Sequence, residues 1–106
     1  MIKKLLFILT VLCASVVFSQ EKSVNKLVAS PNPFFNSTTI TFNSTTQQEV
    51  LISVRNVLGK TVFTKKINAQ KGLNELPFKR NDLSSGMYIY AIQTGNEVIS
   101  KRFVIR

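Results

Sequence analysis

The chain has 106 residues and a formal net charge of +9, and it contains one cysteine and no histidine. This length is that of a single domain. The single cysteine, Cys13, lies near the start, and histidine is absent. The rest of the chain therefore lacks the Cys and His ligands of a usual zinc site and the residues for Cys-His catalysis. The basic residues occur singly or in pairs and no signature of a nucleic-acid-binding module is present, so no nucleic-acid partner is expected.

The first segment, residues 1–19, has the three parts of a secretory signal peptide. A short basic start precedes an apolar run over residues 5–12, and small or apolar residues occupy the positions that signal peptidase reads. We therefore predict cleavage between Ser19 and Gln20. The apolar run is about half of the roughly 20 residues that a spanning helix needs, so this segment is not expected to be a membrane anchor. No transmembrane segment is expected in the mature chain either. The residues before Cys13 differ from those of a bacterial lipoprotein signal, which disfavours a lipid anchor.

A short leader, residues 20–29, is expected between the signal peptide and the folded domain, which we place at residues 30–106. The domain opens with a rigid turn, because two prolines fix φ and favour extended conformations in the residues before them. The residues of this turn are Pro31, Asn32, Pro33 and Phe34. Such a segment does not fit the interior of a sheet.

Alternating apolar and polar residues predict short β-strands in the middle of the chain. Residues 38–43 form the first clear strand, and residues 50–56 form a half-buried strand with Ile52 on its apolar face. The chain then reverses at a hairpin turn made by Leu58, Gly59 and Lys60.

Two further strands follow this turn. In the returning strand, residues 61–68, the adjacent apolar residues Val62 and Phe63 break strict alternation and indicate a β-bulge. The next strand, residues 73–79, contains Pro77. Proline cannot donate a ladder hydrogen bond, so this strand is expected at the edge of a sheet.

The final segment predicts a β-hairpin. A polar turn ends at Gly86, a β-rich run with Tyr88 follows, and Gly95-Asn96 reverses the chain into residues 97–106. Residues that tolerate positive φ suit such a turn, because they match the twist of the two strands. The second strand ends in a basic pair and an apolar run, Lys101, Arg102, Phe103, Val104, Ile105 and Arg106. Chain ends are usually polar and loose, so this pattern indicates a recognition signal.

The fold class follows from these elements. The four glycines fall at predicted reversals, and no part of the mature chain has a sustained helical period. Six or seven short strands at these spacings predict an all-β fold, an antiparallel two-sheet sandwich that is immunoglobulin-like in layout. The pattern does not determine strand order.

Catalytic chemistry is not indicated. The five acidic residues are spread singly along the chain, with no spacing typical of a carboxylate pair or a calcium loop. Serine and threonine are frequent, but no residue pattern supplies an oriented base or an oxyanion hole. We therefore expect no enzyme activity, no cofactor and no metal.

Four segments, in this order, resemble the type A carboxy-terminal sorting domain of the Bacteroidetes type IX (Por) secretion system. They are PNPF at 31–34, VRNVLGK at 54–60, LSSGMY at 83–88 and KRFVI at 101–105. The resemblance covers nearly the whole mature chain. Asn56 stands where the family often has aspartate.

This resemblance implies a seven-stranded sandwich that the outer-membrane translocon recognises, with the terminal hairpin required for export. The sorting signal would then include Gly86, Tyr88 and residues 101–106. The protein would pass through the periplasm to the cell surface or the medium. The family often has a sortase cut upstream that joins the cargo to anionic lipopolysaccharide.

A second class of function stays open, in which the same sandwich is an adhesion module for a polyanionic glycan or a protein partner. The basic and apolar end of the chain favours sorting. Family members place the domain behind a large cargo, whereas residues 20–29 alone are expected to precede it here. A minimal secreted protein, a remnant of a truncated gene and a small surface effector are all consistent with this arrangement.

Overall fold

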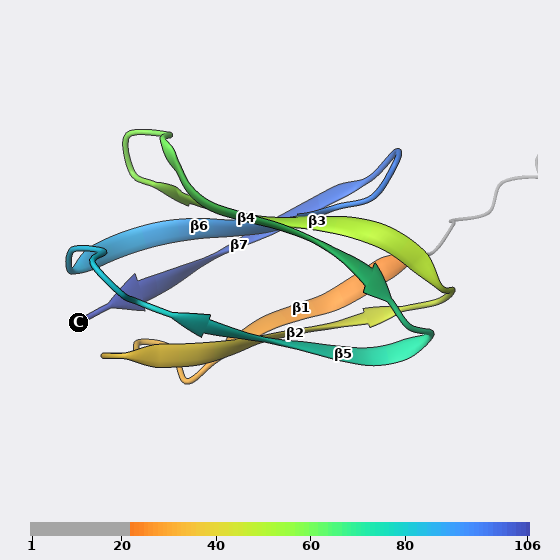
Figure 1. The fold of residues 1–106 in the computed structure, drawn as a ribbon, viewed down its shortest axis with the longest axis horizontal. Helices are drawn as coiled ribbons and strands as arrows, with labels where there is room; N and C mark the ends of the chain where they lie inside the picture. Colours follow the sequence, from red (N-terminus) through yellow and green to blue (C-terminus); the bar gives the residue numbers. More distant parts are fainter. Residues whose placement is uncertain (1–21) are drawn as a thin grey trace, which may run out of the picture.

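The computed structural model describes residues 22–106, and these residues form seven β-strands and no helix (Figure 1). The strands are β1 (Val24–Ser30), β2 (Ser37–Ser44), β3 (Gln48–Asn56), β4 (Thr61–Ala69), β5 (Gly72–Lys79), β6 (Gly86–Gln93) and β7 (Val98–Ile105). The predicted signal peptide, its cleavage site and Cys13 lie outside the described residues.

The strands form two antiparallel sheets that pack face to face. One sheet has three strands in the order β1-β2-β5, and the other has four in the order β4-β3-β6-β7. Figure 1 shows the two layers one above the other, with β1, β2 and β5 below. The predicted all-β sandwich of about seven strands is confirmed.

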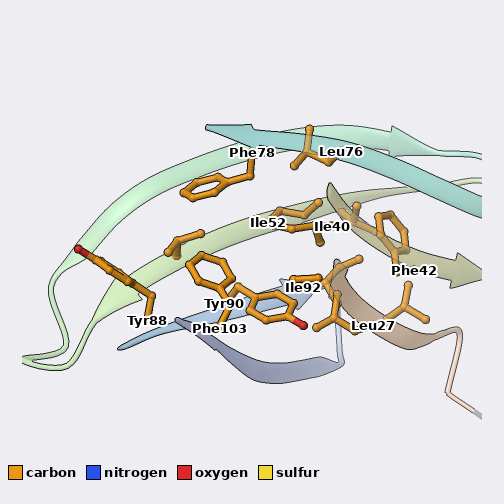
Figure 2. Packing of buried hydrophobic residues seen from close by; sticks show 14 of the residues in the cluster. Leu27, Ile40, Phe42, Ile52, Leu76, Phe78, Tyr88, Tyr90, Ile92 and Phe103 are labelled. Carbon is orange, nitrogen blue, oxygen red and sulfur yellow. The ribbon is translucent and has the colours of Figure 1, made fainter. Parts of the chain in front are cut away.

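The core lies between the sheets because the alternation of each strand turns one set of side chains inward. In β3 the inward residues are Val50, Ile52 and Val54, each no more than 1% exposed. Figure 2 shows Ile52 among aromatic and aliphatic side chains from both sheets. Burying one such side chain stabilises the fold by about 1.5–3 kcal/mol. No cysteine is available in the described residues, so this core stabilises them without disulfides.

Two irregularities agree with the sequence. The register of β3 and β4 shifts between the pairs Val54↔Phe63 and Arg55↔Thr61, which leaves Val62 as the extra residue of a β-bulge. Pro77 lies in β5, an edge strand of its sheet. Both predictions are confirmed.

The segment expected to be a leader differs from that expectation. Its described part forms most of β1, which pairs with β2. The register shifts between Asn25 and Val28, and Lys26 has a φ of 55° at this bulge. The extra residue brings both Val24 and Leu27 to the core face, where they are 0% and 2% exposed. Simple alternation cannot show this strand, because its first two buried residues, Val24 and Leu27, are three positions apart.

The hairpin of β6 and β7 is confirmed, although its turn differs in conformation from the expected one. Neither Gly95 nor Asn96 is among the described residues with positive φ. The turn is closed instead by Thr94. Its backbone N–H donates to the carbonyl of Glu97 at 2.9 Å, and its hydroxyl oxygen accepts from the N–H of Glu97 at 3.1 Å.

Candidate functional site

The sequence segments of the predicted sorting signal gather at one end of the sandwich. At this end lie the β1–β2 connection, the β3–β4 turn, the β5–β6 loop and the end of β7, seen together on the left in Figure 1. Gly86, the first residue of β6, pairs with Ile105 near the end of β7. One hollow is lined both by the β3–β4 turn, including Leu58, and by Gly86 and Tyr88. Residues distant in sequence therefore form a single surface.

The Pro-Asn-Pro-Phe turn binds the outer edge of β7. The side-chain amide of Asn32 donates to the carbonyl of Arg102 at 3.1 Å, and its oxygen accepts from the N–H of Val104 at 3.0 Å. Two residues later, the N–H of Phe34 donates to the carbonyl of Val104 at 3.0 Å, and its carbonyl accepts from the N–H of Arg106 at 2.8 Å. Phe34 and Ile105 thus form a parallel bridge.

These four hydrogen bonds explain the residue types of the Pro-Asn-Pro-Phe turn, because they satisfy backbone groups at the edge of β7. β7 is the edge strand of its sheet, so its outward N–H and C=O groups have no strand partner there. The chain leaves β1 at Ser30 in the other sheet and crosses to β7 by Phe34. Pro31 and Pro33 donate no hydrogen bond, and the carboxamide of Asn32 supplies both a donor and an acceptor. We call residues 31–34, with these contacts, the clasp.

Phe103 of β7 lies at the centre of an aromatic cluster. It is 0% exposed, and its ring centroid is 5.1 Å from that of Phe34, 5.5 Å from Phe78 and 5.2 Å from Tyr90. Tyr90 stacks on it, whereas Phe34 meets it edge to face. Aromatic pairs in these arrangements add about 0.5–1.5 kcal/mol beyond their buried area. Figure 2 shows Phe78, Tyr88, Tyr90 and Phe103 together between the sheets.

Tyr88 fixes the loop before β6. Its ring is 4% exposed, and its hydroxyl donates to the carbonyl of Ser84 at 2.8 Å. The hydroxyl oxygen of Ser84 lies 3.4 Å from the hydroxyl oxygen of Tyr88. Gly86 has a φ of 148°, a backbone conformation that residues other than glycine rarely adopt. The two residues therefore set the path by which the chain enters β6.

Arg80 is a residue of this end that the sequence reasoning missed. Its Nε donates to the carbonyl of Leu83 at 2.8 Å, and its Nη2 donates to the hydroxyl of Ser85 at 2.9 Å. Its Nη1 donates to the carbonyl of Arg106 and, at 3.4 Å, to that of Phe35. One guanidinium thus joins the β5–β6 loop to the end of β7. The sequence signal for this role was the position of Arg80, a basic residue directly before the turn at residues 81–83.

The β3–β4 turn is closed by Asn56. Its side-chain oxygen accepts from the N–H groups of Leu58 and Lys60, each at 3.0 Å. Gly59 has a φ of 86°, a conformation that suits glycine. An aspartate oxygen has the same acceptor capacity, so asparagine is compatible with this turn. Leu58 is 90% exposed at its tip.

The structure divides the predicted sorting residues into two groups. Tyr88, Phe103 and Ile105 are buried in the core. The exposed members are Gly86, Lys101, Arg102, Val104 and Arg106. Lys101 differs from the others in place, because it lies in mid-strand beside β1, where it lines a groove. The exposed group is the part that a partner can contact while the domain stays folded.

The remaining chemistry of the described residues is limited. They contain no group of three or more His, Cys, Asp or Glu residues that could hold a metal ion. No helix in the same part of the chain is long and apolar enough to cross a membrane. Burial raises the pKa of Tyr90, and a hydrogen bond with the backbone of Ala29 acts in the opposite direction. This tyrosine is a core residue with its hydroxyl bonded to β1.

Comparison with known proteins identifies the fold's family. The family described as the secretion system C-terminal sorting domain matches residues 29–106, which begin within β1 and include the clasp, the aromatic cluster and β7. No curated protein matches the chain. The match covers most of the sequence and all four of the segments that form the described end of the sandwich. The chain therefore belongs to the family of C-terminal sorting domains of the type IX secretion system.

Proposed function

We propose that this protein is a non-catalytic sorting module that the type IX translocon recognises and exports across the outer membrane. The family match supports a sorting role. The observation that supports a defined recognition surface is the alternation at the end of β7, where Phe103 and Ile105 are buried while Arg102 and Val104 are exposed. The inward residues stabilise the sandwich, and the outward residues are available to the translocon.

The recognition surface extends from β7 onto β6. Met87 pairs with Val104, and Ile89 pairs with Arg102. Met87, Ile89 and Val104 are each about 40% exposed, and because they are neighbours on the two paired strands they form a contiguous apolar strip. A guanidinium beside an exposed apolar strip is typical of protein interfaces. We define this surface by Met87, Ile89, Arg102 and Val104 and call it the β6–β7 face.

The sorting proposal is tested by a graft. Residues 22–106, joined to the carboxyl end of a foreign periplasmic protein, should take it to the cell surface or the medium in cells with a working type IX translocon. Cells that lack the translocon serve as the control and should retain the fusion in the periplasm. A fusion that stays periplasmic while the parent protein is exported would overturn the proposal.

Export is also proposed to end in surface attachment. The sorting role is compatible with a sortase that cuts upstream of the domain and with transfer to anionic lipopolysaccharide. Intact mass and lipopolysaccharide immunoblotting of the exported protein test this step. A protein recovered from the medium with residues 22–106 uncut and without glycolipid would limit the role to secretion.

A further inference from the structure

The outer edge of β7 has two halves that differ in their partners. Residues 102, 104 and 106 direct backbone groups outward to the clasp. The carbonyl of Glu97 is directed inward to β6. Because inward and outward groups alternate along a regular antiparallel strand, the N–H and C=O groups of Val98 and Ser100 also point outward. Within the described chain no strand is hydrogen-bonded to that half of the edge, and β1 of the facing sheet lies beside it.

The other sheet edges have features that discourage strand addition. β4 has adjacent exposed lysines, Lys65 and Lys66. β5 has Pro77, and β1 has the bulge at Lys26. Charged residues, proline and bulges are the usual means by which sheet edges avoid pairing with other chains. The first half of β7 has a regular backbone without proline or a bulge, its one charged residue is Lys101, and a groove lies beside it.

This groove runs between β7 and β1 of the facing sheet and has a volume of about 540 Å³. Its apolar lining residues are Val24 and Leu27, which are buried, Ile99, which is half-buried, and Val98, which is exposed. Its exposed charged residues are Lys22, Lys26 and Lys101. Glu97, the acid directly before Val98, accepts hydrogen bonds from the N–H and hydroxyl of Ser23, and it does not line the groove. An apolar floor with a basic rim suits an extended chain that has both apolar and acidic side chains.

We propose that the groove between β1 and β7 binds an extended acidic segment of a partner protein, which adds as a strand to β7 at Val98 and Ser100. The clasp shows how this edge is bound, because Asn32 and Phe34 satisfy the same kind of outward groups further along the strand. Strand addition supplies affinity through backbone hydrogen bonds, and the side-chain environment supplies specificity. Here the three lysines favour acidic over basic peptides.

A second copy of the chain fits this edge less well. Two copies paired through β7 would both bring the same basic residues, Lys22, Lys26 and Lys101, to the shared edge, and like charges at an interface are unfavourable. Lys101 also occupies a position on the core-facing side of β7, and a charged residue there disfavours the addition of an apolar strand. An acidic strand removes both objections. The inference goes beyond the sorting proposal, because it concerns a different half of the strand from the β6–β7 face.

Peptide binding to the purified protein tests the proposal. The probe is a fluorescent peptide, Glu-Val-Glu-Ile-Glu, and its two controls are Lys-Val-Lys-Ile-Lys and the same acidic peptide with N-methyl groups on alternate amides. We expect the acidic peptide to bind, the basic peptide not to bind, and N-methylation to weaken binding about tenfold or more, because it removes the donors of one edge. Chemical-shift changes on binding should be largest at the amides of Val98, Ser100 and Lys101.

Matched variants separate the groove from general charge. Lys22→Glu with Lys26→Glu should weaken the acidic peptide about tenfold, whereas Lys65→Glu with Lys66→Glu, the same charge change on β4, should alter binding less than about twofold. Ser100→Pro removes an outward N–H and should abolish binding, while Ser100→Ala keeps it and should bind normally. Circular dichroism establishes that each variant is folded.

Three results would overturn the proposal. Equal binding of the N-methylated peptide, with competition by polyphosphate, would make the groove a simple polyanion site. Equal effects of the two lysine pairs would show that the peptide senses net charge alone. A concentration-dependent dimer that Ser100→Pro dissociates would assign the edge to a second copy of the chain.

Discussion

Asn32 and Val104, 72 positions apart in the sequence, are joined by a hydrogen bond of 3.0 Å from the backbone N–H of Val104 to the side-chain oxygen of Asn32. The same carboxamide donates to the carbonyl of Arg102. One side chain therefore takes the place of a neighbouring strand at the end of β7. The turn at the start of the family match and the sorting residues at its end form one structural unit.

Replacing Asn32 should loosen this unit. Asn32→Ala removes a donor and an acceptor, and we expect a loss of about 0.5–2 kcal/mol in the free energy of unfolding. The amide of Val104 should also exchange faster with solvent, because its acceptor is gone. Asn36→Ala, an exposed asparagine on the same connection, is the control and should cost no more than about 0.5 kcal/mol. Unchanged exchange at Val104 in the first variant would contradict the clasp.

The exposed pair on β7 should affect export without affecting folding. Lys101 and Arg102 are both exposed, so Lys101→Ala with Arg102→Ala should shift the melting temperature little, since surface changes usually cost within about 0.5 kcal/mol. Export across the outer membrane should fall, with the protein accumulating in the periplasm. Single variants then distinguish the β6–β7 face from the groove, because Arg102 belongs to the first and Lys101 to the second. Normal export of the double variant would remove these cations from the sorting signal.

Deleting residues 101–106 is a weaker test, because it removes core side chains together with the exposed ones. The single residue Phe103 contacts three other rings, those of Phe34, Phe78 and Tyr90. We expect Phe103→Ala to cost about 3–5 kcal/mol, much of the total of about 5–15 kcal/mol for a small domain. Urea denaturation measures this cost. A loss below about 1 kcal/mol would contradict the central place of Phe103 in the core.

The inward face of β3 gives an independent check of the core. Ile52 is 1% exposed, and an unpaired carboxylate there costs several kcal/mol, so Ile52→Asp should not fold. Ser53→Asp, one residue later on the outer face, is the matched control and should keep a β-type circular dichroism spectrum. A folded Ile52→Asp protein would mean that the two faces of β3 are exchanged.

The sequence was sufficient for the local features of this fold and insufficient for its long-range contacts. Alternation revealed β3, two adjacent apolar residues revealed the bulge at Val62, and Pro77 marked an edge strand. The strand β1 was missed, because the bulge at Lys26 breaks its alternation. The role of the Pro-Asn-Pro-Phe turn was also missed, since a turn pattern does not contain the identity of a partner in β7.

The same distinction applies to the candidate site. Gly86, Tyr88 and the end of β7 were found as motifs. Their buried members could be separated from their exposed ones only with the register of β7 against β6. Arg80 was not considered, although its guanidinium contacts residues on the β5–β6 loop and at the end of β7. Contacts of this kind depend on which loops meet at one end of a sandwich, and that follows from strand order.

Stability at high pH should depend on Tyr90. Burial disfavours the charged phenolate, so the pKa of Tyr90 is raised in the folded protein above its ordinary value of 10.0, which the unfolded chain retains. The unfolded chain therefore loses this proton first. The contribution of Tyr90 is fully present below pH 10 and declines as the pH rises from there through the folded pKa.

Tyr90→Phe isolates this effect. The variant keeps the ring that stacks on Phe103 but has no ionisable group, so its stability should fall less than that of the unsubstituted protein when the pH is raised from 8 to about 11. Urea midpoints of both proteins at each pH give the comparison. Lysine deprotonation over the same range acts on both proteins and cancels in their difference. Below pH 9 we expect the variant to be at most about 1.5 kcal/mol less stable, through the lost hydrogen bond with Ala29. Parallel declines in the two proteins would show that Tyr90 ionises as freely in the folded sandwich as in the unfolded chain.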